Sequence, residues 1–128
     1  MSKTPNDLKY SKSHEWVKIE GGNAKVGITH HAQDTLGDIT FVELPKVGAS
    51  VKNGAEAGVI ESVKAASDLY SPVTGEIVSV NNDLESAPEA INSDPYGKGW
   101  LYTVKISDTS EIDALMDAPA YEKYLETI

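Results

Sequence analysis

Apolar and polar residues alternate in short runs along most of the chain, a pattern typical of β-strands that bury one face. Val17 and Ile19 alternate with polar neighbours up to Gly21-Gly22, and residues 23–28 continue the alternation, so the two runs predict a hairpin. Four later runs share a bias toward β-branched and aromatic residues and are also predicted as strands: 38–44, 57–60, 69–78 and 100–106. The pattern therefore indicates a mainly β chain.

Three short helices are predicted among these strands. Thr29 is placed to cap a helix over 30–36, before a glycine that ends it. Ser110 is predicted to cap a second helix that starts at Glu111, with Asp113 completing a capping box. The third helix brings three apolar side chains to one face, namely Tyr121, Tyr124 and Leu125. The apolar faces of the two C-terminal helices are expected to pack against the β-strands. The alternative is that they dock a partner protein.

Two segments show neither the apolar–polar alternation of a strand nor the apolar spacing of an amphipathic helix. Residues 1–9 are polar and are expected to be loosely held, at least at their start. Residues 81–99 are rich in turn-forming residues and predict a loop with one helical turn near 88–91.

One lysine stands at the tip of a predicted hairpin. Val63-Lys64 lies between the run 57–60 and the run that begins at Leu69, and Ala65 and Ala66 leave the lysine sterically open. Its ammonium should project into water, where a modifying enzyme could deprotonate and acylate it. A lysine at a hairpin tip also serves simply to keep a protein in solution, so position alone leaves both interpretations open.

Composition narrows the classes of partner. The 128 residues include eleven lysines, no arginine and enough acids to give a net charge of −9. Nucleic acids and anionic membrane surfaces are disfavoured as partners because phosphate contacts need clustered cations. An acidic carrier would instead be steered toward basic docking faces, although the charge could also serve only solubility.

Several kinds of chemistry are excluded or disfavoured. The chain has no cysteine, which excludes disulfides, thiolate metal sites and a cysteine nucleophile. Its three histidines, His14, His30 and His31, do not predict a metal site, and no Gly-x-Ser-x-Gly motif predicts a serine nucleophile. No apolar leader, membrane-spanning run or arginine-rich transit segment is present, so a cytoplasmic protein is expected.

The sequence around Lys64 resembles a lipoyl-attachment signature, and the wider chain resembles the glycine cleavage system H-protein family. Four stretches carry the resemblance: Ser13-His14-Glu15-Trp16, Gly27-Ile28-Thr29-His30-His31-Ala32-Gln33, Glu61 through Gly75, and Asn92 through Trp100. Only the stretch around Lys64 is specific by itself, but the four occur in the family's order over most of the chain. Extra elements at both termini favour this family over the lipoyl domains of dehydrogenase complexes.

The resemblance implies a fold as well as a function. It implies a flattened antiparallel barrel or sandwich of two sheets, of the lipoyl-domain (hammerhead) type, with short helices that include C-terminal ones. The whole chain, 1–128, would form a single lipoyl-carrier domain. The attachment hairpin would occupy about 55–80 and the C-terminal helical segment about 110–126.

By the same resemblance the protein is a shuttle and not an enzyme. Lipoate on Lys64 would accept an aminomethyl group from a pyridoxal-phosphate glycine decarboxylase and pass it to a tetrahydrofolate-dependent aminomethyltransferase. Dihydrolipoamide dehydrogenase, with FAD, would then reoxidise the dithiol, and a lipoate ligase or lipoyl transferase would attach the group. Tethering keeps the carried group at a high effective concentration near each docked active site.

The resemblance also implies residues that act on the loaded arm. Ser13, Glu15 and Asp68 are expected to contact its cationic amine, because a charge removed from water needs a polar partner. Glu61 is expected to help the attaching enzyme recognise the hairpin. The alternative for each acid is an ordinary solvated residue.

Two other carriers remain open from sequence. A biotin carrier would use a similar hairpin lysine, although Val63 and Ala65 stand where biotin sites typically have methionine. A relative that relays lipoyl groups to other proteins, or that stays unmodified, would have the same sequence features.

Overall fold

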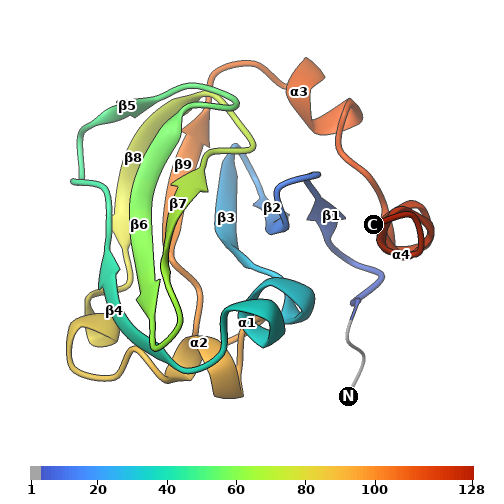
Figure 1. Ribbon diagram of the computed structural model, residues 1–128. Coiled ribbons are helices and arrows are strands. Elements are labelled where there is room, and N and C mark those ends of the chain that lie inside the picture. The colour runs from blue at the N-terminus through green and yellow to red at the C-terminus, as the bar shows by residue number, and fades with distance from the viewer. Residues whose placement is uncertain (1–3) are drawn as a thin grey trace.

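The computed structural model describes residues 4–128 and shows a sandwich of two antiparallel β-sheets with short helices around it (Figure 1). The strands are β1 (Lys9–Tyr10), β2 (Glu15–Glu20), β3 (Asn23–Ile28), β4 (Ile39–Glu43), β5 (Ser50–Val51), β6 (Glu56–Ser62), β7 (Ala66–Tyr70), β8 (Gly75–Val80) and β9 (Tyr102–Ile106). The helices are α1 (His30–Leu36), the 3-10 helix η1 (Asn82–Glu85), α2 (Ala90–Ser93), α3 (Ser110–Asp113) and α4 (Ala118–Leu125). One sheet has the strand order β1-β2-β3-β9-β8-β5, and the other has the order β4-β6-β7. The predicted two-sheet, mainly β fold is confirmed.

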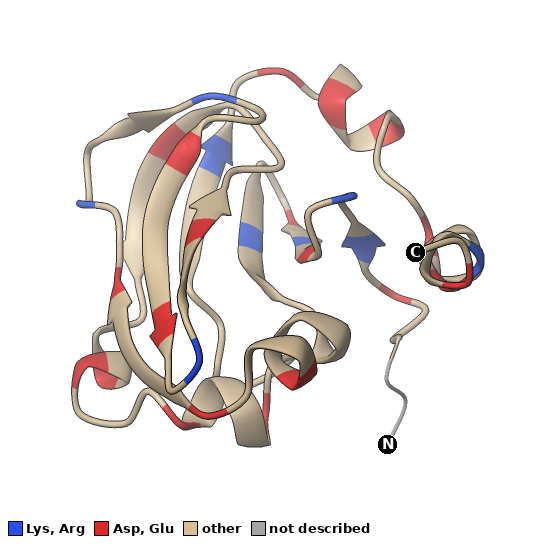
Figure 2. Ribbon diagram, viewed as in Figure 1, with Lys and Arg blue, Asp and Glu red and all other residues tan. Residues whose placement is uncertain are grey.

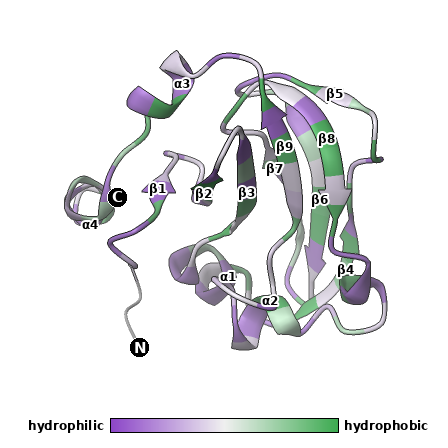
Figure 3. Cartoon of the chain, turned by 180° about the vertical axis from the view of Figure 1, so that it is seen from behind, coloured by the Kyte–Doolittle hydropathy of each residue, from purple (hydrophilic) through white to green (hydrophobic). Residues whose placement is uncertain are grey.

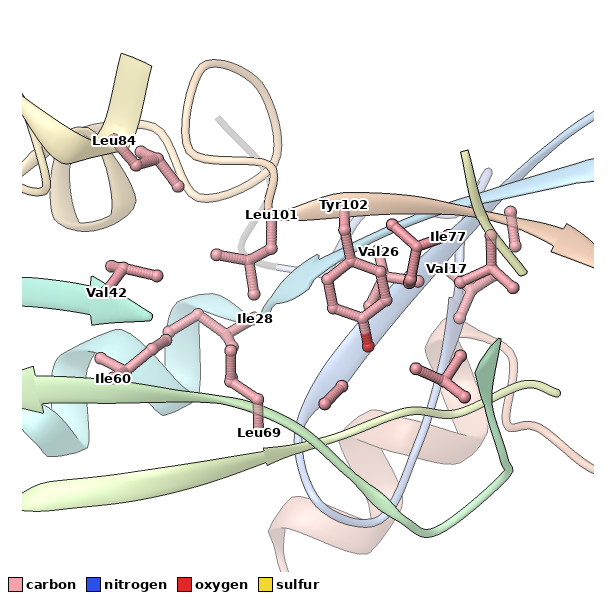
Figure 4. Close-up of a cluster of buried hydrophobic side chains, with 14 of the residues drawn as sticks. Val17, Val26, Ile28, Val42, Ile60, Leu69, Ile77, Leu84, Leu101 and Tyr102 are labelled. Carbon is pink, nitrogen blue, oxygen red and sulfur yellow. The ribbon is translucent and has the colours of Figure 1, made fainter. Parts of the chain in front are cut away.

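The main hydrophobic core lies between the two sheets. Its buried side chains come from both sheets and from the segments that close the ends, and Figure 4 labels Val17, Val26, Ile28, Val42, Ile60, Leu69, Ile77, Leu84, Leu101 and Tyr102. Burial of each such aliphatic side chain contributes about 1.5–3 kcal/mol. Hydrophobic and hydrophilic segments alternate along the strands in Figure 3, as expected for strands with one buried face.

A second, smaller core joins the C-terminal helix to the N-terminal strands. It consists of Leu8, Tyr10, Trp16, Ala118 and Tyr121. Helix α4 therefore packs beside β1, as Figure 1 shows. The expectation that the last helix packs against the β-structure is confirmed for Tyr121, which is 1% exposed.

Local sequence explains the first hairpin and the helix after it. Strands β2 and β3 pair across the predicted turn, with Glu20 opposite Asn23. Helix α1 has the predicted bounds, and the Thr29 hydroxyl accepts a hydrogen bond from the N–H of Ala32. Gly37 ends the helix at a φ of +79°, a conformation that disfavours any residue with a Cβ.

The run predicted as one strand over 69–78 is two strands in different sheets. Strand β7 pairs with β6, whereas β8 pairs with β9 and β5. The chain crosses between the sheets at residues 71–74, where Pro72 cannot donate to a strand ladder. The buried Ser71 hydroxyl donates to the carbonyl of Val73 at 2.6 Å and stabilises this crossing. The hairpin that carries Lys64 therefore consists of β6 and β7.

The predicted capping box at the second helix is wrong. Thr109 occupies the N-cap of α3 without a side-chain cap, and the Ser110 hydroxyl instead donates to Asp108 at 2.5 Å. Glu111 is used elsewhere, because its two carboxylate oxygens accept from the N–H and hydroxyl of Thr74 at 2.6 and 2.7 Å. The predicted cap therefore fails because α3 begins one residue earlier, at Ser110, and Glu111 makes a tertiary contact with the crossing segment.

The two segments without periodicity are more ordered than predicted. Of the start expected to be loose over 1–9, residues 1–3 lie outside the described part of the chain, whereas Thr4 and Leu8 are buried. In the predicted loop over 81–99, helix α2 begins two residues later than expected and is preceded by η1. Buried Leu84 and Ile91 fix these turns to the core.

Candidate functional site

Lys64 lies at the tip of the β6–β7 hairpin. The turn is closed by the N–H of Ser62, which donates to the carbonyl of Ala65 at 2.8 Å. The Ser62 hydroxyl also accepts from the N–H groups of Lys64 and Ala65, both at 3.2 Å. The N–H of Val63 donates to the carbonyl of Asp38 at 3.0 Å, which fixes the tip to the start of β4. The predicted position of the lysine in a tight turn is confirmed.

The Lys64 side chain is exposed and has no ionic partner among residues 4–128. Its aliphatic part lies near the glycine that ends α1, since a Cβ built on Gly37 would be 3.4 Å from Cε of Lys64. Figure 2 shows one basic segment at this tip and acidic segments on both strands that lead to it. The amine is therefore accessible, and it stands alone within an acidic surrounding.

The two acids predicted near the lysine lie on the strands of the hairpin. Glu61 is exposed on β6, opposite Ala66 on β7 and Phe41 on β4. Asp68 is exposed on β7, opposite Val59. Glu61 is therefore close to the hairpin tip, whereas Asp68 lies farther along the strand.

A cleft of about 450 Å³ lies at the other end of β7. Its walls come from the turn before β2, the end of β7 and the segment after α3, and its lining includes Tyr10, Ser11, Lys12, Ser13, Asn53, Gly54, Tyr70, Ser71, Pro72, Glu111, Ala114, Leu115 and Met116. Aromatic and aliphatic side chains supply a partly apolar wall, and the serines supply hydroxyl groups. This combination suits a flexible apolar chain that ends in a polar group.

Glu15 lies behind the two serines of this cleft. Its side chain is 3% exposed, and its Oε1 accepts hydrogen bonds from the hydroxyl of Ser11, at 2.6 Å, and from that of Ser13. Burial raises the pKa of the Glu15 carboxyl to about 6, while those hydroxyls and the backbone N–H of Tyr70 act in the opposite direction. The structure therefore brings Ser13 and Glu15 together beside the cleft, and their contact with the amine of the cargo stays a prediction.

We expect this carboxyl to make stability depend on pH. Because the pKa of Glu15 is raised from 4.5 to about 6, the folded protein retains a proton that the unfolded chain releases between these values. The free energy of unfolding should therefore fall as pH rises through this window, by roughly 2 kcal/mol in total. Urea titrations of wild type and Glu15→Gln from pH 4 to pH 7 would measure the effect. The difference between the two profiles isolates Glu15, because every other titrating group contributes equally to both proteins. Parallel profiles would therefore contradict the expectation.

Asp68 stands between the lysine and the cleft. Tyr70, at the end of β7, is six residues after Lys64, which corresponds to about 20 Å of extended chain. Asp68 is about two-thirds of the way along, two residues before the N–H that interacts with Glu15. No hydrogen bond joins Asp68 to Ser13 or Glu15 among the described residues, so it flanks the path to the cleft without forming part of the Glu15 cluster.

Sequence reasoning missed several residues of the site. The Ser11 hydroxyl donates to the Glu15 carboxylate, as that of Ser13 does, and Ser11 lies four positions before Glu15 across a turn. The role of Ser62 in shaping the tip and that of Glu111 beside the cleft were also missed. Only Ser62 had a recognisable signal, because serine favours turns through its short hydroxyl.

Residues 8–128 match the family model described as Glycine cleavage H-protein. The chain belongs to the glycine cleavage H-protein family. It is 58% identical over 127 residues to the glycine cleavage system H protein of Cronobacter sakazakii and 57% identical to that of Idiomarina loihiensis, and each alignment covers 98% of both chains. The crystal structure of a glycine cleavage system H protein from Mycobacterium marinum matches with a TM-score of 0.84 and 40% identity, covering 96% of this chain and 97% of that one.

As an H protein, the chain is a lipoyl-bearing shuttle component of the glycine cleavage system and not itself a catalyst. The function predicted from the stretch around Lys64 and the three accompanying stretches is confirmed at this level. Across residues 4–128, no group of three His, Asp or Glu side chains is placed to hold a metal ion. None of the helices in this range has the length and apolar character needed to cross a bilayer.

Proposed function

We propose that Lys64 is the residue of this H protein that carries lipoate, in amide linkage. The observation that supports the proposal most strongly is the exposed, unpaired amine at the tip of a turn that Ser62 closes. An amine in that position can enter the active site of an attaching enzyme without any change in the fold. Glu61, exposed three residues earlier on β6, provides a charged contact by which a lipoate ligase or lipoyl transferase recognises this tip.

The residues of the cleft fit the far end of a lipoyl-lysine arm. Such an arm spans about 15 Å from Cα by standard bond lengths, and the aminomethyl group extends it further. Strand β7 leads from Lys64 past Asp68 to the cleft, so an arm laid along it brings its end toward Ser13 and Glu15. When attached, lipoate would supply a disulfide that can accept the aminomethyl group, and the lipoyl group would remain on the lysine as a dithiol after the cargo is delivered.

Each polar residue then has a defined task toward the cationic amine. Glu15 supplies the negative charge from a largely dry position, and the Ser13 hydroxyl supplies an oxygen acceptor at the mouth of the cleft. Asp68 supplies a second carboxylate on the approach. An ammonium beside Glu15 favours the ionised carboxylate, so binding of the cargo opposes the raised pKa of that group.

The proposed route of the cargo follows the system to which the family belongs. The whole chain acts as one carrier domain in the cytoplasm, loaded by a glycine decarboxylase that uses pyridoxal phosphate. It delivers the group to an aminomethyltransferase that uses tetrahydrofolate. Dihydrolipoamide dehydrogenase then reoxidises the dithiol of the arm through FAD. The acidic strands around Lys64 favour partners with basic docking faces.

The intact mass of the protein from its native cell tests this proposal. We expect the mass of the chain plus one lipoyl group, located on the peptide that contains Lys64. A biotin increment would replace the proposal with a biotin carrier. An unmodified chain from cells that lipoylate their other carrier proteins would instead support a relay or structural role.

A further inference from the structure

His14 is the one residue other than glycine with a positive φ, +70°, in the part of the chain that the structure describes. It stands between Ser13 and Glu15, whose side chains bond to each other beside the cleft. A left-handed backbone is unfavourable for a residue with a Cβ and persists only where surrounding contacts impose it. The turn that presents Glu15 to the cleft is therefore held in place by something outside itself.

The side-chain contact that holds it comes from the C-terminal helix, while the backbone N–H of Thr29 donates to the carbonyl of His14 at 3.0 Å. Nδ1 of His14 lies 2.8 Å from the hydroxyl of Tyr121, on α4, and that hydroxyl lies 2.8 Å from Oγ1 of Thr29, the residue that caps α1. The Tyr121 hydroxyl has one proton, so it donates to one of these neighbours and accepts from the other. This chain of hydrogen bonds, buried at Thr29 and Tyr121, links the two helices to the middle of the turn.

Ring contacts hold the same turn from a second direction. The ring of Tyr10, the residue just before the turn, stacks on Tyr121 with centroids 4.7 Å apart and planes 9° from parallel. The His14 ring also lies 4.7 Å from that of His31 on α1. Tyr121 thus contacts both the residue that enters the turn and the residue at its strained position, although it is not among the residues that line the cleft.

We infer that Tyr121, acting through His14, is a positioning residue for Glu15: helix α4 holds the turn over residues 11–14 in the shape that places the two serine hydroxyls on the Glu15 carboxylate. The inference rests on the proposed function, in which Glu15 receives the amine of the cargo. It assigns the C-terminal helix a task in protecting the cargo, beyond its contribution to the second hydrophobic core. The hydroxyl of Tyr121 is the group that performs it, because the ring alone would already complete that core.

Four variants separate this task from simple packing. Tyr121→Phe keeps the ring and removes the hydroxyl. His14→Ala removes the Nδ1 contact and disfavours the positive φ. His14→Asn is the rescue, because asparagine tolerates a positive φ and carries a polar atom at the same distance from the backbone. Lys123→Gln, an exposed change on the same helix, is the matched control.

The first measurement uses the unlipoylated protein and hydrogen exchange of backbone amides. The N–H of Glu15 donates to the Ser11 hydroxyl at 3.0 Å and the N–H of Ser11 donates to the carbonyl of Glu15 at 2.9 Å, so their exchange reports the geometry of the turn. In Tyr121→Phe and His14→Ala we expect both amides to exchange about threefold to tenfold faster, as the loss of one hydrogen bond implies. The amide of Ile77, in the main core, should stay unchanged, and His14→Asn should restore protection.

The second measurement is the lifetime of the aminomethyl-loaded protein, well below the unfolding midpoint. Tyr121→Phe and His14→Ala should shorten it by a factor of about three or more, while His14→Asn and Lys123→Gln should match wild type. Wild-type exchange and lifetime in Tyr121→Phe, alongside a shortened lifetime in Glu15→Ala, would overturn this inference alone. Equal lifetimes in wild type and Glu15→Ala would instead overturn the proposed role of Glu15. Faster exchange at Ile77 as well would also overturn the inference, by showing that the hydroxyl stabilises the whole fold.

Discussion

Lys64→Arg should abolish lipoylation of this H protein. Arginine keeps the positive charge and much of the length of the side chain, but its guanidinium stays protonated and offers no free amine to acylate. Because Lys64 is exposed and makes no ion pair among the described residues, the change should leave the fold intact. Incubation of the variant with a competent lipoate ligase, followed by intact-mass measurement, should show only the unmodified chain.

Lys52→Arg is the matched control for that experiment. Lys52 is also exposed and lies in the connection between β5 and β6, so its replacement shows whether a Lys→Arg change in an exposed connection impairs lipoylation by itself. We expect it to be lipoylated like wild type. A lipoyl group on the Lys64→Arg chain would show that another lysine is an acceptor and would remove the basis of the proposed site.

Glu15→Ala should shorten the lifetime of the aminomethyl-loaded protein about tenfold or more. The loaded carbon bears both sulfur and an amine, so water can release it as formaldehyde and ammonium and leave the free thiol. A buried carboxylate that pairs with the amine opposes this loss, and a hydrogen bond to a charged group is worth about 1.5–3 kcal/mol. The release of formaldehyde from isolated loaded protein, followed over time, measures the lifetime directly.

Three further variants define what that result means. Glu20→Ala removes an exposed acid at the other end of β2 and should leave the lifetime at its wild-type value. Ser13→Ala should shorten it less than Glu15→Ala, because the carboxylate remains. Asp68→Asn tests the second carboxylate on the approach. If Glu15→Ala and Glu20→Ala gave the same lifetime, the cleft would not hold the amine, although the role of Lys64 would be unaffected.

The sequence by itself determined the fold class and the position of the lysine. Alternation of apolar and polar residues set most of the strands, and Thr29 with Gly37 set the bounds of α1, because caps and turns act within a few residues. The residues around Lys64 likewise specify a tight turn through short-range hydrogen bonds that involve Ser62. Interactions of this range can be deduced from the order of residues alone.

Contacts between distant segments decided the remainder. The run over 69–78 looks continuous in sequence, yet its two halves pair with different partners, because the core between the sheets needs apolar side chains from both. The Glu111 carboxylate accepts hydrogen bonds from Thr74, which lies 37 residues earlier, a contact that no local motif predicts. Pairings across such separations depend on topology, which a local motif does not encode.

The candidate site divides in the same way. Ser13, Glu15 and Lys64 could be named from sequence, but the cleft exists only where the turn before β2 meets the end of β7 and the segment after α3. The raised pKa of Glu15 follows from burial that these segments produce together. Likewise, the strained backbone of His14 is stabilised by Tyr121, which lies 107 residues later in the chain. The sequence thus determined which chemical groups are present and where the chain turns. Tertiary packing decided which of these groups are removed from water, paired and close to one another, because desolvation depends on every segment that surrounds a group.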